Sequence, residues 1–511
     1  MSYFLRPPVS GLDSLSQESR IVATPWSRIV RGVGLGQHPI GYDIGTRKLI
    51  SRSVTLLCDK LAGADTYTTF TAALISLILA AVRPGSCDLK LHIDATAEAF
   101  SGIANPYSRA TAGTIMLDAI AKLHLDIGDK ARSIAREVLD ALDEIQPDAI
   151  QDENQGRHGD YERVSASTAV FLAFCRAGLA DLLTDGGRDR IFESLAALDN
   201  VPTPFFRGRG GSMLIASIAL LGREDALITH GTVESVLSCM DRVDEIRLYP
   251  AFPSPMSAAF IKAYPLVTML NAIGTMGDPS RYLTFGADRL QEATNLMEAL
   301  EPVENTHMAL YYVIALKNLG QLDTRLPDLD DFVEHVVGMW SIIDPGCDYF
   351  LYGISYAYMI QLAYFVGRAD LIADAMIDRM LSAFRTLEGT AENRANRPYP
   401  FSYALNVLTE LGLGDLLHTT HPDYDGQSPY SWVIDHLSDG GREEAGRLYM
   451  LDHALISWAL RLRSPEPQPE GGRFGPSSAL GAPPLERSST PETSDAMLDL
   501  LRYRDETFFW G

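Results

Sequence analysis

Apolar stretches with helical spacing that end in glycine recur along most of the chain. The clearest are "LHLDIGDKAR", "FCRAGLADLL", "IALLGREDAL", "MLNAIGTMGD", "IALKNLGQLD", "QLAYFVGRAD" and "VLTELGLGDLL". Their glycines lie 44 to 52 residues apart, at Gly128, Gly178, Gly222, Gly274, Gly320, Gly367 and Gly412. Glycine just past a helix end commonly adopts the left-handed conformation that terminates the helix. Because this period has room for two helices and two turns, the pattern predicts stacked α/α hairpins.

The same pattern predicts the fold class, since no comparable series of alternating strands is present. We therefore expect an all-α fold. Stacked α/α hairpins form either an open solenoid or a closed double ring of helices, the α/α barrel, and the period fits both. The longest apolar run, "FTAALISLILAAV" at residues 70–82, is too short to span a bilayer and indicates a buried helix instead of a membrane insertion.

Charge and cysteine usage narrow the class of protein. The chain has 511 residues, 46% of them hydrophobic, and a formal net charge of −23. This acidity argues against binding to nucleic acid or to anionic membranes, although a few local cations or a metal ion would suffice for a small anionic ligand. The five cysteines form no C-x-x-C pair and the chain start has no basic-then-apolar order, so we expect a cytoplasmic protein.

One apolar helix in the middle of the chain opens on polar residues. Residues 301–320 read "EPVENTHMALYYVIALKNLG", so Glu304 and Asn305 stand at the mouth of a helix that is otherwise apolar. Acids and amides are favoured at a helix start by the free N–H groups and the helix dipole, which is one hypothesis for this segment. The other hypothesis is a carboxylic acid placed to deliver a proton.

The segment also resembles the acid element of class II terpene cyclases. In that family D-x-D-D-T-A leads into an apolar helix ending in Leu-Gly, and here Pro302, Glu304 and Asn305 stand at the acid positions, followed by Thr306. Five further segments resemble other elements of the same family and occur along the chain in the family's order. They are "RVSASTAVFLAF", "LYPAFPSPMSAAFIKAYPLVTML", "CDYFLYGISYAYMIQLAYFVG", "RPYPFSYALNVLTELG" and "GREEAGRLYMLDHALISWAL". Two of the three acids are replaced and the family's Q-x-x-D-G-x-W-G repeats are missing, so this would be a divergent member.

The resemblance implies two α/α barrels with a substrate cavity between them. Its domain divisions would be an N-terminal segment belonging to the β-like barrel (1–40), a γ-like barrel (41–250), a β-like barrel with the acid element (251–463), a flexible linker rich in Pro, Gly and Ser (464–493) and a short amphipathic segment (494–511). The implied reaction is protonation-initiated cyclisation of a linear prenyl substrate, a prenyl diphosphate. Glu304 would be the general acid and Asn305 its hydrogen-bond partner.

A site that protonates an alkene needs an acid, aromatic side chains and, for a diphosphate, cationic groups. Protonating an alkene needs a carboxylic acid that is still protonated near neutral pH. The pKa of a free Glu is about 4.3, and burial in an apolar cavity raises it, so that the proton is retained. Aromatic faces would stabilise the carbocation, and we expect Tyr311, Tyr352 and Tyr356 to line the substrate. Arg207 and Arg209, in what reads as a glycine-rich turn, would hold phosphate. Mg²⁺ would help only to hold the diphosphate, and no protein metal site is predicted.

Other polar segments suggest metal chemistry but have simpler explanations. "PDLDDFVEH" contains a D-D-x-x-E pattern at Asp330, Asp331 and Glu334, and we interpret it as the acidic start of a helix. The histidines of "HTTHPDYD", His418 and His421, are weak evidence for a metal pair. "QDENQGRHGDYE" is interpreted as a solvated loop, with an acid that holds magnesium as its alternative.

Two further functions stay open from the residues alone. The chain could be a non-catalytic helical-repeat scaffold whose concave face and tail bind another protein. It could also be an α/α-barrel enzyme of different chemistry, such as a terpenoid hydratase or isomerase.

Overall fold

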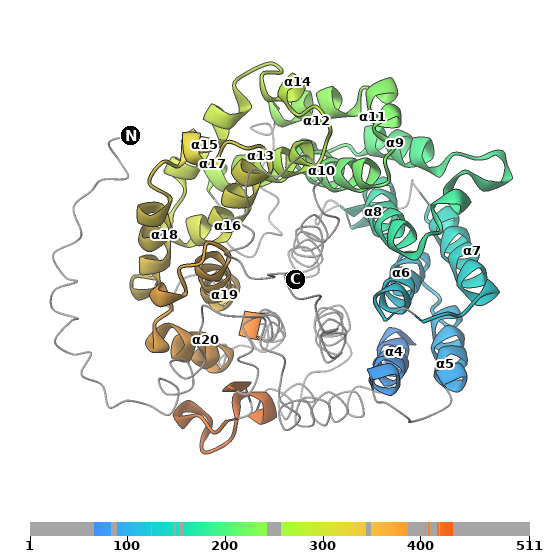
Figure 1. The fold of residues 1–511 in the computed structure, drawn as a ribbon, viewed down its shortest axis with the longest axis horizontal. Helices are drawn as coiled ribbons and strands as arrows, with labels where there is room; N and C mark the ends of the chain where they lie inside the picture. The colour runs from blue at the N-terminus through green and yellow to red at the C-terminus, as the bar shows by residue number, and fades with distance from the viewer. Residues whose placement is uncertain are drawn as a thin grey trace, which may run out of the picture.

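The computed structural model places helices in a curved double layer (Figure 1). It describes residues 66–82, 89–123, 125–146, 150–152, 157–242, 257–343, 349–386, 404, 407–408, 416–417 and 419–432. Apart from helices, the described regular structure is one antiparallel pair of short strands, β1 (Ile150–Asp152) and β2 (Arg157–His158). The prediction of an all-α fold is confirmed for this part of the chain.

The inner layer of the array follows the chain order, and each inner helix packs against the next. Its members are α4 (Thr66–Val82), α6 (Pro106–Lys122), α8 (Gly159–Ala177), α10 (Pro204–Leu220), α13 (Ala258–Gly274), α16 (Pro302–Asn318) and α19 (Tyr349–Phe365). In Figure 1 they follow an arc from blue through green to orange. The inner layer therefore connects segments that lie far apart in the sequence.

The outer layer covers the inner one, with one outer helix packed on each inner helix. Its members are α5 (Leu89–Ser101), α7 (Asp129–Glu144), α9 (Arg190–Asn200), α12 (Thr232–Met240), α15 (Arg289–Ala299), α18 (Leu329–Gly338) and α20 (Asp374–Thr386). Short helices connect inner and outer helices: η1 (Ala180–Gly187), α11 (Glu224–His230), α14 (Ser280–Leu283), α17 (Leu322–Arg325), η3 (Met339–Ser341) and η4 (Ala369–Leu371). A further short helix, η6 (Pro422–Tyr424), packs against α20. Each inner helix and the outer helix packed on it form one of the α/α hairpins that the glycine period predicts.

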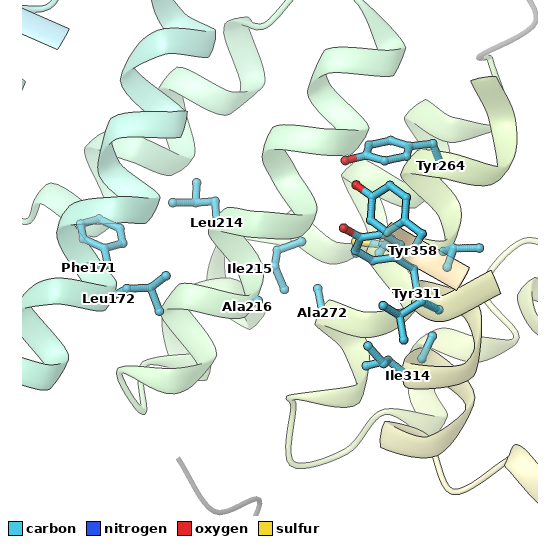
Figure 2. Packing of buried hydrophobic residues seen from close by; sticks show 14 of the residues in the cluster. Phe171, Leu172, Leu214, Ile215, Ala216, Tyr264, Ala272, Tyr311, Ile314 and Tyr358 are labelled. Carbon is cyan, nitrogen blue, oxygen red and sulfur yellow. The ribbon is translucent and has the colours of Figure 1, made fainter. Parts of the chain in front are cut away.

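The sequence of each helix explains its layer. Inner helices are mostly apolar and can be buried on all sides: every residue of α16 from Glu304 to Leu316 is buried, as is every residue of α13 from Ala263 to Ile273. The outer helix α7 buries only one face, formed by Ile134, Ala135, Val138, Leu139, Ala141 and Leu142. A helix that is apolar all round must be covered on all sides, whereas an amphipathic helix needs cover on one side only. Figure 2 shows part of the resulting core.

The periodic glycines take two different roles. Five of them have a positive φ angle: Gly128, Gly178, Gly222, Gly320 and Gly367. For Gly128 the prediction of a left-handed helix end is nevertheless wrong, because this residue is the N-cap of α7 and its ψ is −133°. Gly320, after α16, shows the predicted helix end, where its N–H donates to Lys317 O and that of Gln321 donates to Leu316 O.

For Gly274 the prediction of a left-handed cap is wrong. It is the last residue of α13, and a Cβ there would lie 2.7 Å from Asn318 Cβ, so close packing against α16 requires the glycine. Gly412 lies outside the described residues.

The predicted domain boundary falls at 250/251, inside a stretch that the structure does not describe. On either side of it, α10 and α13 pack directly against each other, so the described helices follow one another in a single array. The division into two barrels stays a prediction. Segments 1–40, 464–493 and 494–511 lie outside the described residues.

None of the described helices is by itself long and apolar enough to cross a membrane. The helix α8 and the 3₁₀ helix η1 reach that length and apolarity only together, and they are bent by 113° relative to each other.

Candidate functional site

Buried polar and aromatic side chains lie in the stretch from the N-terminal ends to the middle of the inner helices. Because an outer helix returns the chain between consecutive inner helices, the inner helices run in one direction and begin at one rim of the array. We call this set the N-terminal rim; its members are Asp160, Glu162, Arg209, Phe260, Tyr264, Glu304, Asn305, His307, Tyr311, Ser355 and Tyr358, all buried. Buried ionisable groups are costly unless they are paired or functional, so this rim is the candidate site.

Glu304 occupies the third position of α16 and accepts three hydrogen bonds. Its Oε1 accepts from Ser257 N at 2.6 Å, and its Oε2 accepts from Ser257 Oγ at 2.6 Å and from Glu301 N at 3.2 Å. The bond to Glu301 is half of a capping box, whose other half is the Glu301 side chain. Ser257 is itself the N-cap of α13, where its Oγ accepts from Phe260 N. One carboxylate therefore joins the starts of two inner helices.

These contacts satisfy the buried Glu304 side chain. All three partners donate to its carboxylate oxygens. The side chain is only 4% exposed, so the three bonds compensate for the water that it loses. The geometry is that of the helix cap, one of the two hypotheses that the sequence left open. The role of general acid stays a prediction.

Asn305 does not make the hydrogen bond predicted for it. Its Nδ2 is directed at Met297 O of α15, at 3.5 Å, and no hydrogen bond joins it to Glu304. The physical reason is helical geometry, because neighbouring residues on a helix point in different directions. Its Oδ1 is buried without a hydrogen-bond partner among the described residues. Two of the three donors to Glu304 come from Ser257, the N-cap of α13, and the third is the backbone N–H of Glu301.

The rim also contains a histidine that the sequence did not single out. His307 Nε2 lies 3.1 Å from Ser355 Oγ of α19, and both residues are completely buried. The imidazole packs on the Tyr358 ring at 4.9 Å, and Tyr311 meets Tyr358 at 6.3 Å between ring centroids. His307 follows Glu304 by three residues and so falls on the same side of α16, which was a usable signal. Nothing local indicated Ser355.

Three tyrosines of the N-terminal rim also carry hydroxyl groups. In Figure 2 the rings of Tyr264, Tyr311 and Tyr358 have their hydroxyl oxygens on the same side. They come from α13, α16 and α19, three successive inner helices. Tyr311, one of the predicted lining residues, is completely buried in the middle of α16, and its contact with a substrate stays a prediction.

The other two predicted tyrosines, Tyr352 and Tyr356, have different outcomes. Tyr356 is buried, and its hydroxyl donates to Trp340 O of η3 at 3.5 Å. The side chain of Tyr352 lies outside the described residues.

The prediction that Arg207 and Arg209 lie in a glycine-rich turn is wrong. Both lie inside α10, whose glycines allow close packing: a Cβ on Gly211 would lie 2.7 Å from Val236 Cγ2. Their side chains also diverge. Arg207 bonds to Asp199 and Ser235 of the outer layer, whereas Arg209 is 1% exposed, with its guanidinium 5.8 Å from the Tyr264 ring centroid. Only Arg209 belongs to the rim.

The acidic "PDLDDFVEH" segment is a helix start, as predicted. Asp330 and Asp331 lie in the first turn of α18, and both are exposed. Asp330 pairs with Arg368 at 3.3 Å. Within the described ranges, no group of three or more His, Cys, Asp or Glu side chains is arranged to hold a metal ion. Asp152 and Glu153 of "QDENQGRHGDYE" and His418 have no described side chains.

His421, the other histidine of the predicted metal pair, packs against α20. Its Nδ1 accepts from Asp423 N at 3.2 Å, and its Nε2 lies 3.9 Å from Asp378 Oδ1. Burial lowers the pKa of His421. Burial and the charges of Asp374 and Asp423 raise the pKa of Asp378 to about 6. The cluster is therefore an electrostatically costly packing contact between α20 and the segment that follows it.

The raised pKa of Asp378 predicts a pH-dependent stability. The folded state binds this proton more tightly than the unfolded chain, so the ionised carboxylate costs stability above pH 6 and the cost fades as the pH falls toward 4. We expect Asp378→Asn to be more stable than wild type at pH 7.5 by about 1 kcal/mol, because the side chain is 34% exposed and solvent weakens the effect. Urea unfolding at pH 7.5 and pH 5 should show this advantage shrinking. An unchanged advantage, or one that the exposed control Asp331→Asn shares, contradicts the prediction.

Comparison with protein-family models, with curated proteins and with solved structures finds no match for this chain.

Proposed function

We propose that this chain binds a linear prenyl substrate, in the form of a prenyl diphosphate, at the N-terminal rim and cyclises it through a carbocation. The observation that carries the proposal is a set of buried aromatic rings: Tyr311 and Tyr358 lie 6.3 Å apart between ring centroids, and the buried Arg209 guanidinium lies 5.8 Å from the Tyr264 ring. Aromatic faces attract a cation by about 0.5–2 kcal/mol each, more in a dry site. We also propose the two-barrel division of the related cyclases as its frame, with the packing of α10 on α13 as the contact between barrels.

Glu304 is the proposed proton donor. In this role its carboxyl would transfer a proton to a terminal alkene carbon, which leaves a tertiary carbocation and a carboxylate. The N–H groups of Ser257 and Glu301 and the Ser257 hydroxyl would stabilise that carboxylate as it forms. A bound substrate would exclude water from this carboxyl group during the transfer. Ser257 thus takes the position that the sequence assigned to Asn305.

A non-catalytic scaffold is the second candidate, and one observation favours it. Every hydrogen bond to the Glu304 carboxylate also caps a helix or fixes the residue that caps one. A carboxylate occupied in this way has a complete structural explanation. In a scaffold the rim would be part of a rigid core, and prenyl compounds would leave the protein unaffected.

The two candidates differ in their response to prenyl diphosphates. We expect geranyl, farnesyl or geranylgeranyl diphosphate to raise the melting temperature and to be converted to a cyclic product, detected by mass spectrometry after phosphatase treatment. Retention of diphosphate in the product would identify protonation as the first step, and a hydrated acyclic product would indicate a hydratase. If none of the three is bound or converted, with or without Mg²⁺, the cyclase proposal is wrong and the scaffold is favoured.

A further inference from the structure

A surface cleft lies at the opposite end of the inner layer, where α6 and α8 finish. Its volume is about 620 Å³, and it is bounded by the last turns of α6 and α8, the loop before α7, the first turn of α7 and the start of η1. We call it the α6–α8 cleft; its lining is Leu117, Ile120, Ala121, Leu125, Asp126, Ile127, Gly128, Asp129, Ala131, Arg132, Arg176, Ala177, Gly178, Leu179 and Asp181. None of these residues belongs to the N-terminal rim, so the cleft is a separate feature.

The cleft combines an apolar floor with charged walls. Leu117, Ile120 and Leu179 are buried members of the core that reach the bottom of the cleft. Leu125 and Ile127 are half-buried and cover its side. A volume of this size is within the range of small-molecule pockets, roughly 300–1,000 Å³. The floor can therefore accept the apolar body of a small molecule.

Two carboxylates of the cleft lining form no ion pair among the described residues. Arg176 pairs with Asp118 at 2.7 Å, and Arg132 pairs with Asp181, so both arginines of the lining are neutralised. Asp126 accepts a hydrogen bond from Gly128 N at 3.1 Å. Among the described residues, neither Asp126 nor Asp129 has a cationic partner.

Helix ends of both signs meet at the cleft, so the backbone gives it no clear polarity. The helices α6 and α8 end there, and the C-terminal end of a helix carries a partial negative charge of about half an elementary charge. The helices α7 and η1 begin there, and each has an aspartate in its first turn, Asp129 and Asp181. The formal net charge of the whole chain, −23, gives the surroundings a negative sign. The lining side chains, three aspartates and two arginines, also have a negative net charge, so the charges around the cleft favour a cation.

We propose that the α6–α8 cleft binds a small organic cation with an apolar body, such as an arylalkylamine. The ammonium group would lie between Asp126 and Asp129, and the apolar body would rest on Leu117, Ile120 and Leu179. The inference is independent of the prenyl substrate proposed for the rim, because it uses other residues at the other end of the inner helices.

Two probes with the same ring and opposite charge test this inference. Tryptamine carries an ammonium group and indole-3-propionate a carboxylate, and both have an indole as the apolar body. Isothermal titration of the full chain should show tryptamine binding at least 10-fold more tightly than indole-3-propionate. In methyl-labelled protein, the Ile120 and Ile127 methyl signals should shift with tryptamine. Equal affinities, no binding of tryptamine, or shifts confined to other isoleucines would overturn the proposal.

A matched pair of variants then locates the ammonium group. Asp129→Asn removes an exposed carboxylate without a cationic partner in the described structure, so it should leave the fold intact and weaken tryptamine about 3-fold. Asp140→Asn removes the same charge from an exposed position of α7 outside the cleft, and it should leave the affinity unchanged. Equal weakening by both variants would show a general effect of net charge and would reject the assigned site.

Discussion

Replacing Glu304 with alanine is expected to lower the free energy of unfolding by about 3 kcal/mol. The change removes an acceptor of three hydrogen bonds and leaves the Ser257 and Glu301 N–H groups without it at a site that is 4% exposed. Leaving buried donors unsatisfied costs about 1–3 kcal/mol each, and bonds to a charged group are at the upper end. Urea unfolding followed by circular dichroism at pH 7.5 measures the loss.

Control variants separate this contact from a simple effect of charge. Asp331→Ala removes an acid from the first turn of another helix, α18, where the side chain is exposed, and should cost less than about 0.5 kcal/mol. Ser257→Ala removes only the hydroxyl, and the Glu304→Ala/Ser257→Ala double variant should be less destabilised than the sum of the two single changes. Additive losses, or equal losses for Glu304 and Asp331, would mean that the carboxylate does not join the two helices.

Glu304→Gln distinguishes the structural role from the catalytic one. The amide keeps the volume and one acceptor oxygen, so we expect a loss of about 1–2 kcal/mol and a folded protein. If Glu304 is the proton donor, cyclisation should fall by a factor of at least 10² in the folded variant. Glu304→Asp should keep part of the activity. If Glu304→Gln turns over substrate as fast as wild type, Glu304 is not the proton donor and acts only as a helix cap.

The sequence predicted correctly those features that depend on residues next to one another in the chain. Glycines at regular intervals and apolar patterns predicted the helical hairpins, and the acidic start of α18 was identified correctly. The resemblance to terpene cyclases directed attention to Glu304, which the structure places at a buried junction. These features follow from backbone conformation and helix ends, which are local properties.

The partners of the rim residues could not be predicted in the same way. Ser257 and Glu304 are 47 residues apart, and His307 and Ser355 are 48 residues apart. Each pair joins two successive inner helices, so it depends on the rotation of one helix against the next. That rotation is set by packing of the whole layer, which no single stretch of sequence specifies.

Glycines inside helices misled the analysis for a related reason. Three glycines in "FFRGRGGSML" are typical of a turn, yet the segment is part of α10. Glycine weakens a helix by about 1 kcal/mol, and only a tertiary contact that excludes a side chain compensates for this cost. Such contacts are visible in the structure at Gly211 and Gly274, where a Cβ would approach a neighbouring helix to 2.7 Å.

Gly113 of α6 makes the closest such contact, and Gly113→Ala is expected to lower the free energy of unfolding by about 2–3 kcal/mol. A Cβ at this position would lie 2.3 Å from Val138 Cγ2 of α7 and 2.7 Å from Phe100 Cε2 of α5. Both neighbours are completely buried, so neither can move without disturbing the core. Overpacking of this kind typically costs 1–3 kcal/mol, which exceeds the gain from the better helix propensity of alanine.

A matched substitution on an outer helix should have the opposite sign. Gly338 ends α18 with an ordinary helical φ of −59°, and nothing lies within 4 Å of a Cβ placed there. Gly338→Ala should therefore stabilise the protein by about 0.5–1 kcal/mol through the smaller entropy of its unfolded chain. Val138→Ala combined with Gly113→Ala should recover part of the loss, because it removes the methyl group that the new Cβ meets. If Gly113→Ala is as stable as wild type, or Val138→Ala adds its full cost to it, α6 does not approach α7 as closely as the structure shows.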